Sequence, residues 1–198
     1  MEFLKVYFDV KTYRPDEEAM KDEGVIAVGY LEDRGGDLSR EDVKVIAKWD
    51  LKWEEVVVRT FYSYLKGLLG KKVELVGFNV LRFDVPLLTL RGVELGVGTL
   101  RELTAIWNSF MVRDLMQVLL AANGWRYRGL KFSNVARAAG MDVEDHGAET
   151  AEAFERGRYD LIERWLVDDV YALWRLDRSR AVEKMIRNYV ERGVRLDP

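Results

Sequence analysis

The stretch that decides the fold reads Phe3-Leu4-Lys5-Val6-Tyr7-Phe8-Asp9-Val10-Lys11-Thr12, an apolar run interrupted by charged residues. We interpret it as a strand, and because side chains alternate along a strand, Asp9 and Lys11 lie on the same face. Desolvating a lone carboxylate is costly, so a buried strand with Asp9 needs a partner or a metal ion for it. This face of the first strand is where we expect chemistry.

Length and composition are those of an ordinary globular domain. The sequence has 198 residues, of which 48% are hydrophobic and 33% are charged, which allows one domain with a proper core. No stretch approaches the about 18 uninterrupted apolar residues of a membrane span, and the N-terminus lacks the pattern of a signal peptide. With no cysteine there are no disulfides and no thiolate metal sites. We expect a single domain over residues 1–198, cytoplasmic and without membrane contact.

Charge and residue usage give further expectations about partners and source. A net charge of −3 provides no overall basic field, so a polyanion must be held by a local basic patch or by metals over carboxylates. Abundant Lys, Arg and Glu without Cys hint at a thermophilic source, although the low count of three Pro argues mildly against it. A negatively charged protein that binds a polyanion often gains grip by assembly, so we expect a possible homo-oligomer.

Periodicity and turn residues predict a mixed α/β order of elements. The expected strands cover residues 3–12, 24–31, 43–49, 73–78 and 110–113. The expected helices cover 53–69, a segment opened by 84–86, 100–107, 115–122, 133–139, 148–156 and 160–192, the last with a break near 177–179. Three antiparallel strands followed by strands that must pair in parallel give a mixed sheet flanked by helices. In such sheets, polar residues at strand ends and helix starts converge on one cleft.

Three stretches, in this order along the chain, resemble the motifs of a known enzyme family. They are Phe8-Asp9-Val10-Lys11-Thr12, Asn79-Val80-Leu81-Arg82-Phe83-Asp84 and Trp165-Leu166-Val167-Asp168-Asp169. Through them the chain is similar to the DEDD superfamily of 3′–5′ exonucleases. The family motifs are Asp-x-Glu, Asn-x-x-x-Phe-Asp and, in the proofreading branch, Tyr-x-x-x-Asp. The resemblance covers nearly the whole chain and implies an RNase H-like fold.

The resemblance also implies a metal-dependent 3′–5′ exonuclease. In the family, two divalent ions about 3.5–4 Å apart are held by carboxylates and stabilise the attacking and leaving oxygens of a phosphodiester. The expected catalytic residues and metal ligands are Asp9, Asp84 and Asp169. Hard oxygen ligands suit Mg²⁺ or Mn²⁺, and the expected partner is single-stranded DNA or RNA.

Two positions depart from the family motifs. Lys11 stands where the family has Glu, and Trp165 stands where the proofreading branch has Tyr. Lys11 removes a bridging carboxylate and adds a like charge beside the metals, a repulsion of about 4 kcal/mol at 4 Å and an effective dielectric near 20. We therefore expect one ion rather than two. The indole of Trp165 donates a hydrogen bond but accepts none, so it cannot replace a tyrosine hydroxyl that orients water.

Three interpretations of Lys11 stay open from the sequence. Its ammonium replaces the charge of one metal and leaves a one-metal nuclease, or Asp168 or Glu149 supplies the missing ligand. In the third, Lys11 pairs with the three aspartates and leaves a binding fold without catalysis. The leading prediction is an exonuclease, and the alternative is a catalytically silent nucleic-acid-binding or protein-interaction domain. A scaffold subunit that uses its apolar helices is a third class, which predicts no binding of oligonucleotide at low salt.

Several further residues are candidate substrate contacts. Trp125-Arg126-Tyr127-Arg128 interleaves aromatic rings with positive charge, which suits a single-strand groove, and a hairpin-like loop with a solvated basic face fits as well. Candidates within the motifs are Lys11, Asn79, Arg82, Phe83 and Trp165. Arg82 and Arg91 are also placed to meet phosphates.

Two simpler roles are expected within the same set. Asn79 and Asp84 fit a turn and a helix cap, and for Asp84 we expect both capping and metal ligation. His146, the only histidine, is a low-weight candidate for proton transfer beside the simpler interpretation of a surface residue.

Overall fold

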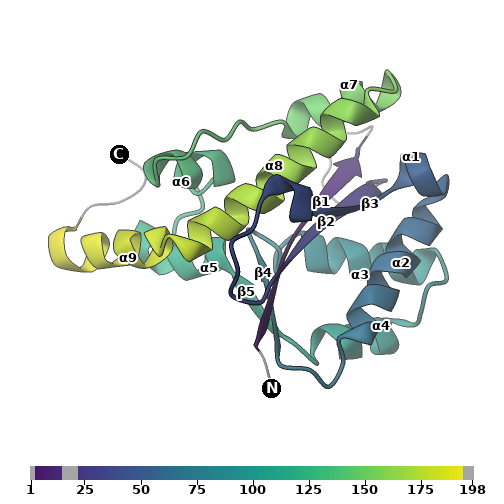
Figure 1. Ribbon diagram of the computed structural model, residues 1–198, viewed down its shortest axis with the longest axis horizontal. Coiled ribbons are helices and arrows are strands. Elements are labelled where there is room, and N and C mark those ends of the chain that lie inside the picture. The colour runs from purple at the N-terminus through teal and green to yellow at the C-terminus, as the bar shows by residue number, and fades with distance from the viewer. Residues whose placement is uncertain (1–2, 15–21, 194–198) are drawn as a thin grey trace.

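The computed structural model describes residues 3–14 and 22–193, and it shows a mixed sheet with helices on both faces (Figure 1). The strand order is β3-β2-β1-β4-β5, so β1 (Leu4–Tyr13) lies at the centre. β2 (Gly24–Asp33) pairs antiparallel with β1, and β3 (Lys44–Ala47) pairs antiparallel with β2. β4 (Val73–Gly77) and β5 (Met111–Asp114) continue the other side in parallel. This arrangement confirms the predicted α/β fold with a mixed sheet.

The alternation of β1 separates two hydrophobic cores. Its even-numbered residues Leu4, Val6, Phe8 and Val10 are buried against the helices of one face. These helices are α2 (Glu54–Gly67), α3 (Asp84–Glu94) and α4 (Leu100–Trp107). Each of these side chains contributes about 1.5–3 kcal/mol by burial. The odd-numbered residues face the other layer, where Tyr7 joins the second core.

The second layer is formed by the C-terminal half of the chain. It consists of α5 (Leu115–Leu120), α6 (Phe132–Ala138), α7 (Gly147–Glu155), α8 (Tyr159–Arg178) and α9 (Ala181–Arg192). In Figure 1, α8 runs obliquely across the sheet, and it contacts both β1 and β2. The break predicted near 177–179 is confirmed, because α8 ends at Arg178 and Arg180 adopts φ 54° before α9 begins.

Some predicted boundaries are wrong for local reasons. Residues 48 and 49, expected at the end of a strand, begin the short helix α1 (Lys48–Leu51). The helix expected to start at Ser133 begins one residue earlier, at Phe132, and Lys131 is its N-cap. Two short 3₁₀ turns, η1 (Arg40–Asp42) and η2 (Ala121–Asn123), complete the elements described. No helix within residues 3–14 and 22–193 has the length and apolar character needed to cross a membrane.

Candidate functional site

The three carboxylates that the sequence singled out meet beside Lys11, where the C-terminal half of β1 lies under α8. β1 presents Asp9 and Lys11 on one face, and the Lys11 ammonium lies 3.0 Å from Asp9 Oδ2. The same ammonium donates a hydrogen bond to Asp169 of α8. Asp84, the first residue of α3, is close enough for Asp9 and Lys11 to shift its pKa. Asp84 and Asp169, which follow Asp9 by 75 and 160 residues in the sequence, are thus brought into its neighbourhood.

A glycine lets α8 approach this part of the sheet. Gly29 of β2 lies opposite Asp9 in the antiparallel register. A Cβ atom on Gly29 would lie 2.7 Å from Leu166 Cγ of α8, which is closer than side-chain packing allows. Because glycine has no side chain, α8 can cross the sheet close to Gly29, and this short distance lets Asp169 reach Lys11.

The Lys11 side chain is the positive centre of the site. Only 14% of it is exposed. Burial alone lowers the pKa of Lys11, but Asp9 and Asp169 raise it, and the net shift is upward. Lys11 is therefore charged at neutral pH and holds the two carboxylates together.

The remaining negative charge falls on poorly solvated carboxyl groups. Burial, with a further contribution from the charge of Asp9, raises the pKa of Asp84 well above its usual value. Burial also raises the pKa of Asp169, to about 6, although Lys11 opposes the shift. Asp84 is 4% exposed, so it is the carboxyl group best placed to keep its proton. Phe83, not Asp84, is the N-cap of α3, so the capping role expected for Asp84 is wrong.

The carboxylates do not fit a divalent ion in this arrangement. Within the described residues, no three His, Cys, Asp or Glu side chains form a group that could hold a metal. The ammonium of Lys11 already pairs with two of the three predicted ligands. The candidate replacements point elsewhere, because Asp168 pairs with Arg40 and Glu149 lies 2.9 Å from His146 Nδ1. The described residues therefore offer no set of ligands for the single ion expected from the sequence as long as Lys11 stays paired with Asp9 and Asp169.

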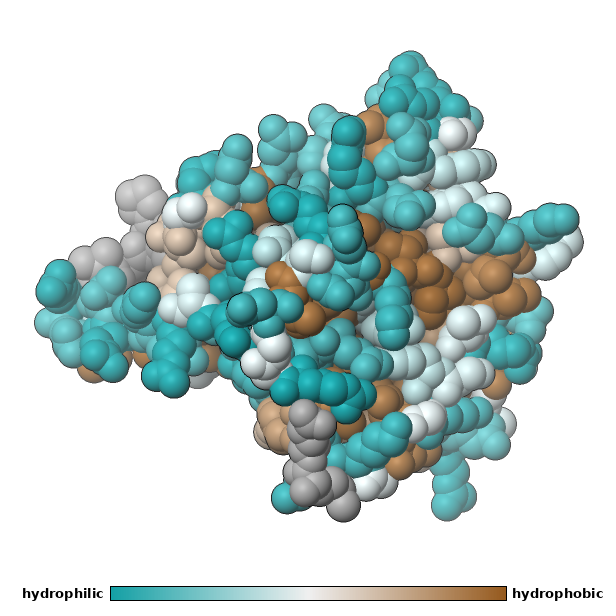
Figure 2. All heavy atoms as spheres, in the orientation of Figure 1, coloured by the Kyte–Doolittle hydropathy of each residue, from teal (hydrophilic) through white to brown (hydrophobic). Residues whose placement is uncertain are grey.

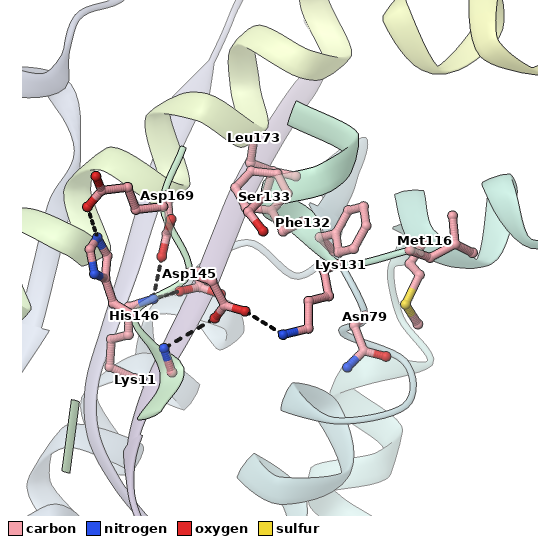
Figure 3. A pocket seen from close by; sticks show the side chains of 15 residues that line it. Lys11, Asn79, Met116, Lys131, Phe132, Ser133, Asp145, His146, Asp169 and Leu173 are labelled. Carbon is pink, nitrogen blue, oxygen red and sulfur yellow. Dashed lines mark hydrogen bonds and ion pairs between the residues drawn. The ribbon is translucent and has the colours of Figure 1, made fainter. Parts of the chain in front are cut away.

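A cavity of about 330 Å³ opens beside the Lys11 cluster. Figure 3 shows Lys11, His146 and Asp169 on one side of it and Asn79, Phe132 and Met116 on the other. Phe78, Leu130 and Leu173 extend the apolar part of the wall. Lys131 also lines the cavity, where it pairs with Asp145 at 2.9 Å. The cavity therefore combines an apolar wall with a cluster of charges.

The aromatic residue of the third motif forms part of the surroundings of this cavity. Trp165 stacks on His146, with ring centroids 4.3 Å apart and planes 12° apart. Trp165 itself lines an adjoining cavity of about 300 Å³, which shares His146 and Asp169 with the first. His146 is therefore held by a ring on one side and by carboxylates around it, rather than lying free on the surface.

The loop of the second motif is held in place by a residue that was not among the predicted site residues. Asp114, at the end of β5, is 2% exposed and accepts hydrogen bonds from the backbone N–H groups of Asn79 (2.8 Å) and Leu81 (3.0 Å). It also accepts a bond from Met116 N at the start of α5. Asn79 has φ 66°, a conformation that this anchoring stabilises. An Asp just before a predicted helix is a cap signal, and it was available in the sequence.

The aromatic and basic loop lies beside the second motif, as its predicted role requires. The Arg82 guanidinium lies 4.5 Å from the centre of the Tyr127 ring. Trp125 is 75% exposed, and Tyr127 is 45% exposed. Asn123 donates hydrogen bonds to the carbonyl oxygens of Arg126 (2.6 Å) and Arg128 (2.9 Å), which fixes the loop without a hairpin.

Two of the other proposed contacts are used inside the protein. Arg91, expected to meet phosphates, donates two hydrogen bonds to Glu54, at 2.7 and 2.8 Å. Phe83 is partly buried and packs against the hydrophobic core that β1 shares with α2, α3 and α4. Neither is among the described residues that line the cavity. Both positions therefore serve the fold of the second motif.

Comparison with known proteins supports the fold. No protein-family profile matches the sequence, and no curated protein matches it. The structure is similar to a solved structure titled "ExoI/SSB-Ct complex", with a TM-score of 0.57 and 11% sequence identity. The match covers 96% of this chain and 43% of the other, so this chain spans less than half the length of that protein. The chain has a mixed α/β architecture consistent with an RNase H-like fold.

Proposed function

We propose that this chain is a single-stranded nucleic-acid-binding domain on a nuclease-type fold, and that Lys11 holds it catalytically silent. The observation that carries the proposal is the Lys11 ammonium paired with both Asp9 and Asp169. A charged amino group in this position supplies the positive charge that divalent ions supply in two-metal nucleases, but it does not activate water. Three interpretations of Lys11 were left open by the sequence. The one in which Lys11 pairs with the aspartates and leaves a binding fold without catalysis is closest to this geometry.

The surroundings of the cavity support binding of a nucleic acid strand. The exposed rings of Trp125 and Tyr127 offer stacking surfaces, and Arg82 beside them offers a contact for phosphate. Asn79 Oδ1 is buried and has no hydrogen-bond donor among the described residues. A base amino group or a sugar hydroxyl in the cavity would supply the missing donor.

A second candidate function is the metal-dependent 3′–5′ exonuclease that the sequence resembles. The convergence of Asp9, Asp84 and Asp169 favours it. In that case Asp9, Asp84 and Asp169 would be the residues that hold Mg²⁺ or Mn²⁺, and Lys11 would have to leave its two partners. The bound ion would then supply the positive charge and the activated water of phosphodiester hydrolysis.

Binding and hydrolysis are tested together with a fluorescently labelled single strand of about 16 nucleotides. We expect anisotropy to report binding, and we expect no shortened products with Mn²⁺. Trp125→Ala and Tyr127→Ala are each expected to weaken binding by about 1–3 kcal/mol, because each removes a stacking surface. Trp53→Ala is the matched control, since Trp53 is 69% exposed but lies at the start of α2.

The outcomes separate the two candidate functions. Shortened products with Mn²⁺ that disappear in Asp84→Ala would establish the exonuclease and reject the silent domain. Equal affinities of the two loop variants and the Trp53 variant would remove the loop from the interface. If the protein fails to bind the strand even at low salt, both nucleic-acid functions are wrong.

A further inference from the structure

A second cavity, of about 1010 Å³, lies at the opposite end of β1. Its walls come from the first residues of β1, the end of β2, β4 and β5, and the junction of α8 with α9. Seven basic and four acidic side chains line it, which gives local positive charge in a chain whose net charge is −3. Figure 2 shows hydrophilic side chains along the arm formed by α9, beside this end of the sheet.

The cations on the sheet side of this cavity are already neutralised. Asp177 is 6% exposed and accepts hydrogen bonds from Lys5 at 2.9 Å and Arg113 at 2.6 Å. Arg178 lies 3.4 Å from Asp33, and Arg34 pairs with Glu32 at 3.1 Å. These groups form rigid walls and leave little charge for a ligand.

The cations on the helix side are different. Arg180, Lys184 and Arg187 are exposed and have no ion pair or hydrogen-bonded side-chain partner within residues 3–14 and 22–193. Lys184 and Arg187 are three residues apart on α9, and Arg180 is the N-cap of that helix, so the three positions follow one another over about 10 Å. Glu183 also lines the cavity, so these three cations outnumber the nearby acid. They form a row rather than a single point of charge.

We propose that the row of Arg180, Lys184 and Arg187 binds the phosphodiester backbone of the nucleic acid strand whose end occupies the Lys11 cavity. A row of cations matches a chain of phosphates better than it matches one anion. Lys5 and Lys11 are six residues apart on β1, which separates the two cavities by about 20 Å. Only a strand long enough to span this distance contacts both. This inference rests on the proposed function and extends the interface to a second site.

The test compares a charge-removed variant with a matched control. The variant carries Arg180→Gly, Lys184→Gln and Arg187→Gln, where glycine suits the φ of 54° at position 180. The control carries Lys66→Gln, Lys71→Gln and Arg101→Gln, three exposed cations from the part of the chain that covers the other face of the sheet. Thermal unfolding of both confirms that they are folded. Anisotropy with strands of about 4 and about 16 nucleotides is measured over a range of salt concentrations.

We expect the variant to change the salt dependence for the longer strand only. Removing three phosphate contacts lowers the slope of log affinity against log salt by about 2, since each contact contributes about 0.7 on a single strand. The shorter strand and the control variant keep the parental slope. In contrast, Trp125→Ala weakens the binding of both strands and leaves the slope of log affinity against log salt unchanged.

The possible failures are distinguishable. An unchanged slope for the longer strand, with Trp125→Ala still weakening binding, rejects the second site and leaves the proposed function standing. An acidic peptide that binds the parent but not the variant, with oligonucleotide binding unaltered, assigns the cavity to a protein partner and overturns the inference. If the parent binds no strand at any salt concentration, the proposed function fails, and the inference fails with it.

Discussion

Lys11→Glu is expected to bind Mn²⁺ about 100-fold more tightly than the parent protein. The change removes the ammonium that pairs with Asp9 and Asp169, and it adds a carboxylate at the same point. The repulsion between two unit charges about 4 Å apart is about 4 kcal/mol before screening, and the about 100-fold change corresponds to about 2.8 kcal/mol of it left after screening, at 1.4 kcal/mol for each factor of ten. Isothermal titration calorimetry with Mn²⁺ measures the change directly.

The same substitution is expected to introduce Mn²⁺-dependent shortening of a labelled single strand. Lys11→Met is the control for charge, because it removes the ammonium without adding a ligand and should bind Mn²⁺ less tightly than the glutamate variant. The double substitution Lys11→Glu, Asp84→Ala is the control for position, and it should abolish any new activity. Mn²⁺ affinity equal to that of the parent would show that Lys11 does not control metal binding.

Asp177→Ala is expected to destabilise the protein by about 3–5 kcal/mol. Asp177 is buried near the C-terminal end of α8 and accepts hydrogen bonds from Lys5 (2.9 Å), Tyr7 (2.7 Å) and Arg113 (2.6 Å). Its removal takes the acceptor from the buried Tyr7 hydroxyl and leaves Lys5 and Arg113 with Glu74 as their remaining carboxylate partner. Urea denaturation measures the loss of unfolding free energy.

An aspartate on the same helix provides the control. Asp168 is exposed and pairs with Arg40 at the surface, so Asp168→Ala should cost no more than about 1 kcal/mol. Equal losses for the two substitutions would contradict the role assigned to the buried network.

The penalty of Asp177→Ala also has an expected pH dependence. Burial raises the pKa of Asp177, but the hydrogen bonds from Tyr7, Lys5 and Arg113 lower it, and the net shift is downward. A carboxyl group with a folded pKa below its unfolded value stabilises the protein above the unfolded pKa, and this is lost as pH falls through the folded pKa. The difference between parent and variant should therefore be constant near neutral pH and shrink below about pH 4.

The sequence was informative where a physical rule relates the position of a residue in an element to the direction of its side chain or its strand. Alternation along β1 predicted that Asp9 and Lys11 share a face, and the ion pair between them confirms it. The mixed sheet followed from the order of strands and helices, because helix-linked strands must pair in parallel. A break near residues 177–179 was also predicted, and α8 ends at Arg178 before α9 begins.

The sequence was less informative where partners come from distant segments. Asp114 anchors the Asn79 loop from 35 residues away, and Asp177 meets Lys5 across 172 residues. Arg91 was predicted to contact phosphate. In the structure it pairs with Glu54, and because Glu54 is distant in the sequence, no local pattern revealed this pairing. Hydrogen-bond partners of this kind depend on how the helices pack onto the sheet, and local patterns do not specify that packing.

In the proposed silent domain, the Lys11 ammonium takes the place of divalent ions between Asp9 and Asp169. A crystal soaked in Mn²⁺ tests it most directly, because anomalous scattering locates the metal and the density locates the lysine. We predict that Lys11 Nζ remains between the two carboxylates and that no Mn²⁺ peak appears among Asp9, Asp84 and Asp169. Mn²⁺ bound to these three aspartates, with the Lys11 side chain displaced, would contradict the account.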